Sequence, residues 1–137
     1  MTQEDKQLLL KDLSTRVPYH VRCKIWLKDG TTEEGLLDLE HNYGNVLQDA
    51  FYYNKIKVIK PFLFPLSSMT EEQKEESPLE PSLLDAFING RIYLFEDEEL
   101  TVGEIIEMID WCNKNHFDYR GLIEKGLAID ATNLKIY

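Results

Sequence analysis

Residues 21–27 read VRCKIWL, with an apolar side chain at every odd position and basic residues at two of the three even positions. This alternation is typical of a β-strand with one buried face and one solvent-facing face. Residues 55–66 read KIKVIKPFLFPL and add a second apolar stretch of strand type. Because Pro61 and Pro65 cannot donate to a strand ladder, residues 60–66 are predicted to be an edge or exit segment. The two stretches predict a small antiparallel sheet on which the rest of the chain is built.

The loop after the first strand predicts a register for the first hairpin. A two-residue Asp29-Gly30 turn would place Glu34 opposite Ile25, on the core face. A three-residue loop at 28–30, with Gly30 left-handed in a bulge, moves Glu34 to the outer face. We therefore predict the three-residue loop and the pairs Leu27–Thr31, Lys24–Glu34, Cys23–Gly35 and Val21–Leu37. The unfavourable feature of this register is that it places Glu33 opposite Ile25.

Further strands are predicted at 35–40, 45–48, 51–53 and 55–59. With a helix at 2–14 before them, five short strands predict an α+β fold containing a small antiparallel SH3/Sm-like barrel. Cys23 would face the core of this barrel as a small apolar residue. Residues 1–66 would form the helix and barrel. Residues 67–137 would form an acidic, mainly helical part packed on it, either as a second unit or within one single domain.

Helix starts are indicated by threonines followed three residues later by an acid or an amide, the capping-box pattern. It occurs at Thr2, Thr70 and Thr101. The last begins a helix predicted at 101–115, whose buried face is expected to be the apolar stripe at helical spacing. That stripe contains Val102, Ile105, Ile106, Ile109 and Cys112, with Met108 and Trp111 on its flanks.

The C-terminal part carries further, shorter signals. A short helix is predicted at 82–88, and Asp118 is predicted to cap one or two turns that end at Gly126. His116, which follows the long helix, is expected to be a capping or surface residue. Residues 134–137 are predicted to add an edge strand beside residues 91–95, an edge pair outside the barrel.

Charged residues are unevenly distributed along the chain. The net charge is −10, and residues 67–137 carry all of it, because residues 1–66 hold nine basic and nine acidic side chains. This argues against nonspecific nucleic-acid binding by the C-terminal half. No apolar run is long enough for a membrane helix, the N-terminus lacks signal-peptide features, and the two cysteines lack metal-type spacing. We therefore expect a cytoplasmic protein with reduced thiols and no membrane association.

Residues 21–30, 35–38 and 45–50 resemble the first motif of Sm-like RNA-binding proteins. The resemblance implies a helix followed by a five-stranded barrel that binds RNA bases from a loop. Asn45 would be the base-binding asparagine of that family, and Tyr43 or His41 would be the stacking residue. The family's Arg-Gly pair in the fourth strand has no counterpart in this sequence.

Residues 59–72 and 117–128 resemble segments of small proteins of gut bacteria that are often found near phage-like or mobile regions. This resemblance implies a bacterial protein of prophage or mobile-element origin. It implies nothing about a mechanism.

The sequence contains no nucleophile elbow, phosphate loop, zinc spacing or dinucleotide fingerprint. We therefore expect a protein that is not an enzyme and uses no cofactor or metal. Two hypotheses remain: a protein-interaction or regulatory module with a protein partner, and an Sm-like RNA-binding module using His41, Tyr43 and Asn45. A contiguous basic face with Trp26 exposed would favour RNA. Ion pairs between the outward basic residues and Glu34, Asp38 and Glu40 would instead indicate an ordinary solvent-exposed sheet face. The outward basic residues are Arg22, Lys24, Lys28, Lys55 and Lys57.

Overall fold

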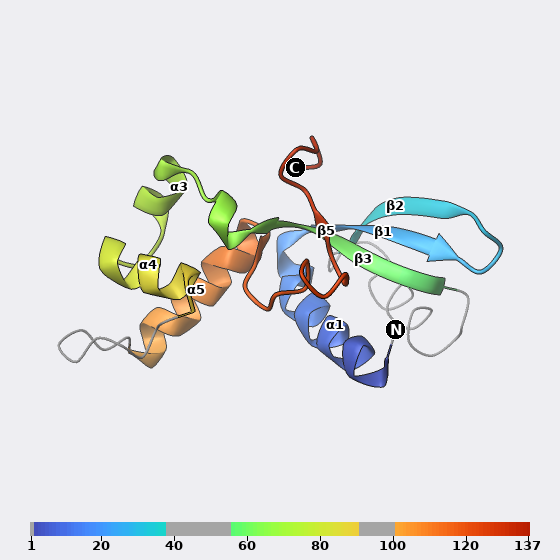
Figure 1. Ribbon diagram of the computed structural model, residues 1–137, viewed down its shortest axis with the longest axis horizontal. Coiled ribbons are helices and arrows are strands. Elements are labelled where there is room, and N and C mark those ends of the chain that lie inside the picture. The colour runs from blue at the N-terminus through green and yellow to red at the C-terminus, as the bar shows by residue number, and fades with distance from the viewer. Residues whose placement is uncertain (1, 38–55, 91–100) are drawn as a thin grey trace.

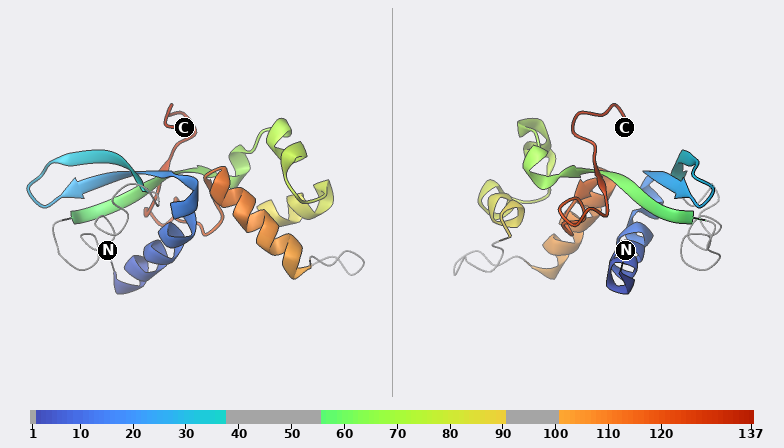
Figure 2. Two further views of the ribbon diagram at one scale, coloured as in Figure 1. Left: turned by 180° about the vertical axis from the view of Figure 1, so that it is seen from behind. Right: turned by 45° about the vertical axis from the view of Figure 1, so that its right-hand side comes forward.

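The computed structural model describes residues 2–37, 56–90 and 101–137 (Figure 1). It confirms an α+β fold, with an elongated arrangement that Figure 2 shows from two further sides. One end holds the sheet and helix α1, and the other end holds three helices. The helices are α1 (Gln3–Arg16), α3 (Glu71–Glu76), α4 (Pro81–Ile88) and α5 (Val102–Lys114), and short 3-10 turns lie at Val17–Tyr19 and Leu66–Ser68.

The first hairpin joins β1 (Val21–Leu27) and β2 (Thr32–Leu37), and the structure confirms its predicted register from Val21–Leu37 to Lys24–Glu34, with Glu33 opposite Ile25. The backbone N–H of Leu27 donates to the Thr31 carbonyl at 2.9 Å, which closes the three-residue loop. Gly30 has a φ of 91°, a left-handed conformation that a side chain would disfavour. The Asp29 carboxylate accepts from the Thr31 N–H at 2.8 Å and stabilises the turn.

Strand β3 (Ile56–Pro65) changes partners along its length. Its first half pairs antiparallel with β1 as far as Pro61, and its second half pairs in parallel with β5 (Ile129–Asp130) and β4 (Phe117–Asp118). The prediction that residues 60–66 form an edge or exit segment is therefore wrong. The bonds to β4 and β5 use the N–H of Phe64 and the carbonyl of Leu63, so neither proline needs an N–H there.

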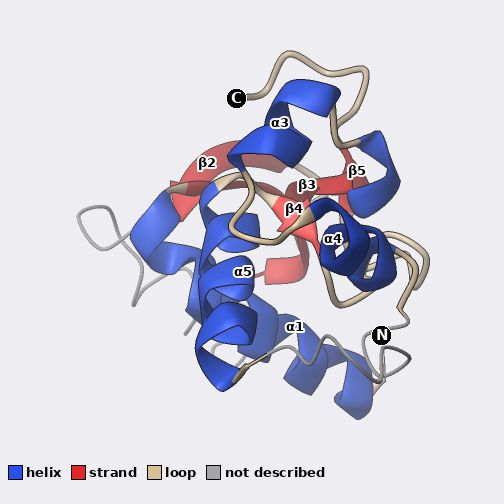
Figure 3. Ribbon diagram, turned by 90° about the vertical axis from the view of Figure 1, so that its left-hand side faces the viewer, coloured by secondary structure: helices blue, strands red, loops and turns tan. Residues whose placement is uncertain are grey.

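The sheet is open over the residues that the structure describes, with strand order β2-β1-β3-β4 and β5 also beside β3. The strands predicted at 45–48 and 51–53, and the one at 91–95, lie outside the described residues, so barrel closure stays a prediction. The edge strand predicted at 134–137 is wrong, since those residues are not in a strand. Figure 3 looks at the molecule from the end that carries α3 and α4, with the strands behind them.

All three predicted capping boxes are confirmed. In each, the threonine hydroxyl accepts the backbone N–H three residues on, at 3.0 Å for Thr2, 3.2 Å for Thr70 and 3.1 Å for Thr101. The helix predicted at 82–88 is also present and begins one residue earlier, at Pro81, whose fixed φ suits a first helical position.

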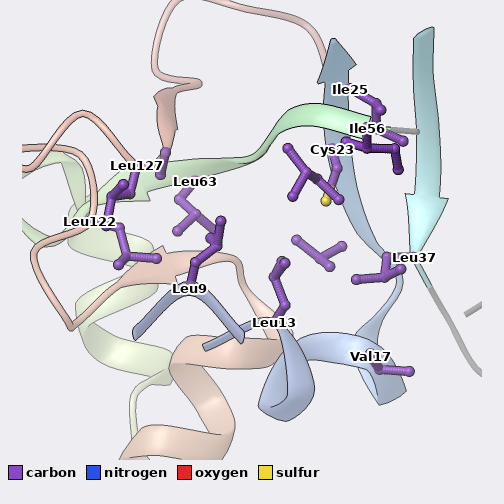
Figure 4. Close-up of a cluster of buried hydrophobic side chains, with 13 residues drawn as sticks. Leu9, Leu13, Val17, Cys23, Ile25, Leu37, Ile56, Leu63, Leu122 and Leu127 are labelled. Atoms are coloured by element: carbon purple, nitrogen blue, oxygen red, sulfur yellow. The ribbon is translucent and has the colours of Figure 1, made fainter. Parts of the chain in front are cut away.

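Two clusters of buried side chains hold the fold together. The first packs α1 against the inner face of the sheet and includes Leu9, Leu13, Cys23 and Ile25 (Figure 4). Residues 122–128 also contribute to it, so the C-terminal segment returns to the N-terminal part. The second lies among the helices and contains Met69, Leu79, Leu83, Leu84, Met108, Cys112 and Phe117.

The predicted buried face of α5 is wrong in part. Val102 is 74% exposed and Ile106 is 55% exposed, and Ile105 and Ile109 are only half-buried. Cys112, the last member of the predicted stripe, is fully buried as expected, and so is Met108, which lies one helical turn before it and was predicted only on the flank. Both residues belong to the second cluster, in which the Phe117 ring also stacks on Trp111 with centroids 5.5 Å apart.

Candidate functional site

The core face of α1 carries two charged residues. Leu9, Asp12, Leu13 and Arg16 follow helical spacing, and all four are 0% exposed. Arg16 Nε donates to Asp12 Oδ2 at 2.6 Å and Nη2 donates to Oδ1 at 3.2 Å. Arg16 Nη2 also donates to the Phe117 carbonyl at 2.8 Å. The two buried charges therefore neutralise each other, and Arg16 links α1 to β4.

A tyrosine extends this cluster to the second half of the chain. Arg16 and Arg120 both lie over the Tyr119 ring, with their guanidinium carbons 5.0 Å and 5.3 Å from its centroid. Arg120 Nε is 3.4 Å from Asp12 Oδ1. The Tyr119 hydroxyl donates to Asn113 Oδ1 at 2.9 Å. These contacts join α1, α5 and β4, and they therefore hold the two ends of the molecule together. We call Asp12, Arg16, Tyr119 and Arg120 the clamp.

Sequence reasoning missed this clamp, although a signal was present. Asp12 and Arg16 are four residues apart and share a helix face with Leu9 and Leu13. Two opposite charges within an apolar stripe indicate a buried ion pair. The predicted capping role of Asp118 is confirmed. Its carboxylate accepts the N–H groups of Leu122 at 3.0 Å and Ile123 at 2.9 Å and so caps the turns that follow.

His116 follows α5 in a left-handed conformation, with a φ of 63°. Its ring stacks on that of Tyr137, with centroids 3.6 Å apart, and the Tyr137 hydroxyl donates to the Phe62 carbonyl at 2.8 Å. The residue terminates the helix as expected, but it is half-buried rather than on the surface. Burial lowers the pKa of His116 to about 4.

We expect stability to fall as the pH is lowered from about 6.5 towards about 4, since His116 takes up a proton more readily in the unfolded chain. His116→Asn, whose side chain tolerates the left-handed conformation, should lose the part of this dependence due to His116. Urea titrations of both proteins between those pH values measure how the free energy of unfolding changes with pH. Parallel curves for the two proteins would contradict a buried neutral imidazole.

The outer face of the sheet carries basic residues around one tryptophan. Lys24 Nζ and Lys60 Nζ lie 5.3 Å and 5.7 Å from the centre of the Trp26 ring, and Arg22 is exposed in the same row of β1. Lys60 is directly opposite Lys24. Glu34 is the partner of Lys24 on the other side, but no ion pair joins them. We call Arg22, Lys24, Trp26 and Lys60 the outer patch.

A groove of about 370 Å³ separates α3 from α4. Its apolar lining is Leu84, Ile88 and Pro81, of which Leu84 is almost fully buried. The polar part of its lining consists of Glu71, Lys74, Glu75 and Asp85. Lys74 is 3.4 Å from Glu71, and Glu75 has no ion pair within the described part of the chain. The groove therefore combines an apolar surface with an acidic rim.

The residues predicted from the Sm-like resemblance, His41, Tyr43 and Asn45, lie outside the described residues. Both cysteines are free and buried, and burial raises the pKa of each thiol to about 12, so Cys23 is a core residue as predicted. In the described ranges no group of three or more His, Cys, Asp or Glu side chains is placed to hold a metal ion. None of the helices there is both long and apolar enough to cross a membrane.

Comparisons with protein-family models, curated proteins and solved structures found no match to the chain. The functional proposals below therefore rest on the residues of this chain and on the resemblances found in its sequence. Among the described residues, the acidic groove at the helical end and the outer patch at the sheet end combine charged with apolar or aromatic side chains.

Proposed function

We propose that the protein is a non-enzymatic protein-interaction module whose docking surface is the groove between α3 and α4. The observation that carries this proposal is the pairing of an apolar lining with an acidic rim in one groove of about 370 Å³. Apolar surface supplies affinity on burial, and rim charges select the partner.

The partner that fits this groove is a protein segment with apolar residues on one side and basic residues beside them. Residues 67–90 contain six acidic side chains and one lysine, so their electrostatic field attracts a basic partner and repels an acidic one. An amphipathic helix presents such a pattern along one face. A regulatory role would follow if docking blocked or recruited that partner.

The wider setting of this proposal comes from the two resemblances. The resemblance of residues 59–72 and 117–128 supports a bacterial protein of prophage or mobile-element origin, and a cytoplasmic location is part of the same proposal. The alternative function, Sm-like RNA binding, rests on His41, Tyr43 and Asn45 and on a barrel that closes through residues 38–55. It remains a separate prediction.

The proposal predicts that a synthetic helix of about 14 residues, with leucine on one face and lysine on the other, binds the full chain. Reversing a rim charge with Glu75→Lys replaces an attraction by a repulsion of similar size. With about 0.5 kcal/mol for each exposed contact, the affinity should fall about five-fold. Isothermal titration calorimetry measures both affinities.

Glu107→Lys is the matched control, because it changes the net charge equally but lies on α5, outside the groove lining. It should leave the affinity nearly unchanged. Equal weakening by both variants would show that the peptide responds only to overall charge. Failure of the basic helix to bind, or equal binding of a helix with glutamate in place of lysine, would also contradict the proposal.

A further inference from the structure

Two lysines face each other across the central pair of strands. Lys24 on β1 and Lys60 on β3 are direct cross-strand neighbours, and both are half-buried on the outer face. Like charges directly opposite each other destabilise a sheet. Neither lysine forms an ion pair with a carboxylate of the described residues, Glu34 included. The outer patch therefore has a local excess of positive charge that an anion would relieve.

The aromatic ring of the patch lies between these charges. Trp26 is the next outward residue of β1 after Lys24, and Val58 is opposite it on β3. The two ammonium groups are at cation–π distance from its ring. Since β1 is hydrogen-bonded on both sides, by β2 and β3, the patch stands on an internal strand of the sheet.

We propose that the outer patch binds single-stranded nucleic acid, with a base stacked on Trp26 and phosphates paired with Lys24, Lys60 and Arg22. An aromatic ring flanked by cations is the combination that such ligands require, since each nucleotide presents one flat base and one phosphate. An acidic peptide would use the lysines but would gain little from the indole ring. The side chains of both lysines are long enough to swing from the ring to a phosphate.

This inference goes beyond the protein-interaction function and does not depend on it. The patch is carried by β1 and β3 at the sheet end of the molecule. The groove is lined by residues of α3 and α4, and these two helices lie at the other end (Figure 1). It also differs from the Sm-like prediction, because none of His41, Tyr43 and Asn45 belongs to it. Binding should be salt-sensitive, because it depends on three cations in a chain of net charge −10.

The test is a fluorescence anisotropy titration of the full chain with labelled U-rich RNA and T-rich DNA, at about 50 mM and about 150 mM salt. Both oligonucleotides should bind at the lower salt. Three phosphate contacts predict a slope of log K against log salt of about −2 for single strands. Trp26→Ala should weaken binding about five-fold or more, and Trp26→Phe should retain most of it. Lys24→Glu should weaken it at least as much.

Lys11→Glu is the matched control, since Lys11 is exposed on α1, on the other side of the sheet, and the variant changes net charge equally. Absence of binding at the lower salt would overturn the inference, as would equal losses in Lys11→Glu and Lys24→Glu. Binding that survives in Trp26→Ala and disappears in Tyr43→Ala would assign nucleic acid to the Sm-like loop instead. A polyglutamate peptide that binds as tightly as RNA would identify an acidic protein as the ligand and would also overturn it.

Discussion

Replacing Asp12 with alanine is expected to lower the free energy of unfolding by about 3–5 kcal/mol. The substitution leaves the guanidinium of Arg16, which is 0% exposed, without its carboxylate. The Phe117 carbonyl remains as an acceptor, but a carbonyl does not neutralise a buried charge. Arg120 loses the same partner, although it is partly exposed and can rehydrate.

The control is a double substitution, Asp12→Leu with Arg16→Met, which removes both charges and keeps apolar volume. A buried ion pair replaced in this way is often neutral or more stable. Urea titrations of the three proteins measure the difference in unfolding free energy. A double variant as unstable as Asp12→Ala would show that the clamp stabilises through its particular hydrogen bonds. A loss below about 1 kcal/mol for Asp12→Ala would contradict its burial as a pair.

Met108→Ala is expected to cost about 2–5 kcal/mol, because Met108 is 0% exposed within the second cluster and alanine leaves a cavity. Ile106→Ala, two residues earlier on the same helix, should change stability by less than about 0.5 kcal/mol. The isoleucine side chain is more than half exposed and alanine is the better helix former.

The same denaturant titration distinguishes the two faces of α5. Comparable losses from Met108→Ala and Ile106→Ala would show that the isoleucine stripe is buried after all. A larger loss from Ile106→Ala would show that the helix is rotated relative to the structure described above.

Local chemistry made several elements predictable from sequence. The first hairpin has one loop length that keeps Glu34 out of the core, so its register follows from Lys24 and Glu34 alone. Each capping box places a helix start within one residue, because the threonine and its partner act over one turn.

Elements set by distant contacts could not be predicted. The isoleucine stripe of α5 satisfies helical spacing as well as the true buried face does, and the distant residues of the second cluster, Phe117 among them, decide between the two faces. Strands β4 and β5 have two residues each, which is too short for an alternating pattern. The second half of β3 was misread because its prolines occupy positions where no N–H is needed.

In the candidate sites too, local sequence predicted some residues, and the residues placed by distant contacts could not be predicted. Alternation along β1 placed Arg22, Lys24 and Trp26 on the outer face correctly. The sequence pattern predicts Lys57 on this face and not Lys60, because it does not reveal the irregularity between Trp26 and Leu27 that shifts the register of β3. The acidic groove could not be foreseen, since it depends on how α3 packs beside α4.

The measurement that tests the protein-interaction proposal most directly is backbone amide hydrogen exchange of the full chain, with and without the lysine–leucine helix. Docking in the groove predicts slower exchange in α3 and α4, with unchanged exchange in β1 and β2 at the other end of the molecule. Protection confined to the sheet, or spread evenly over the chain, would contradict the groove as the docking surface.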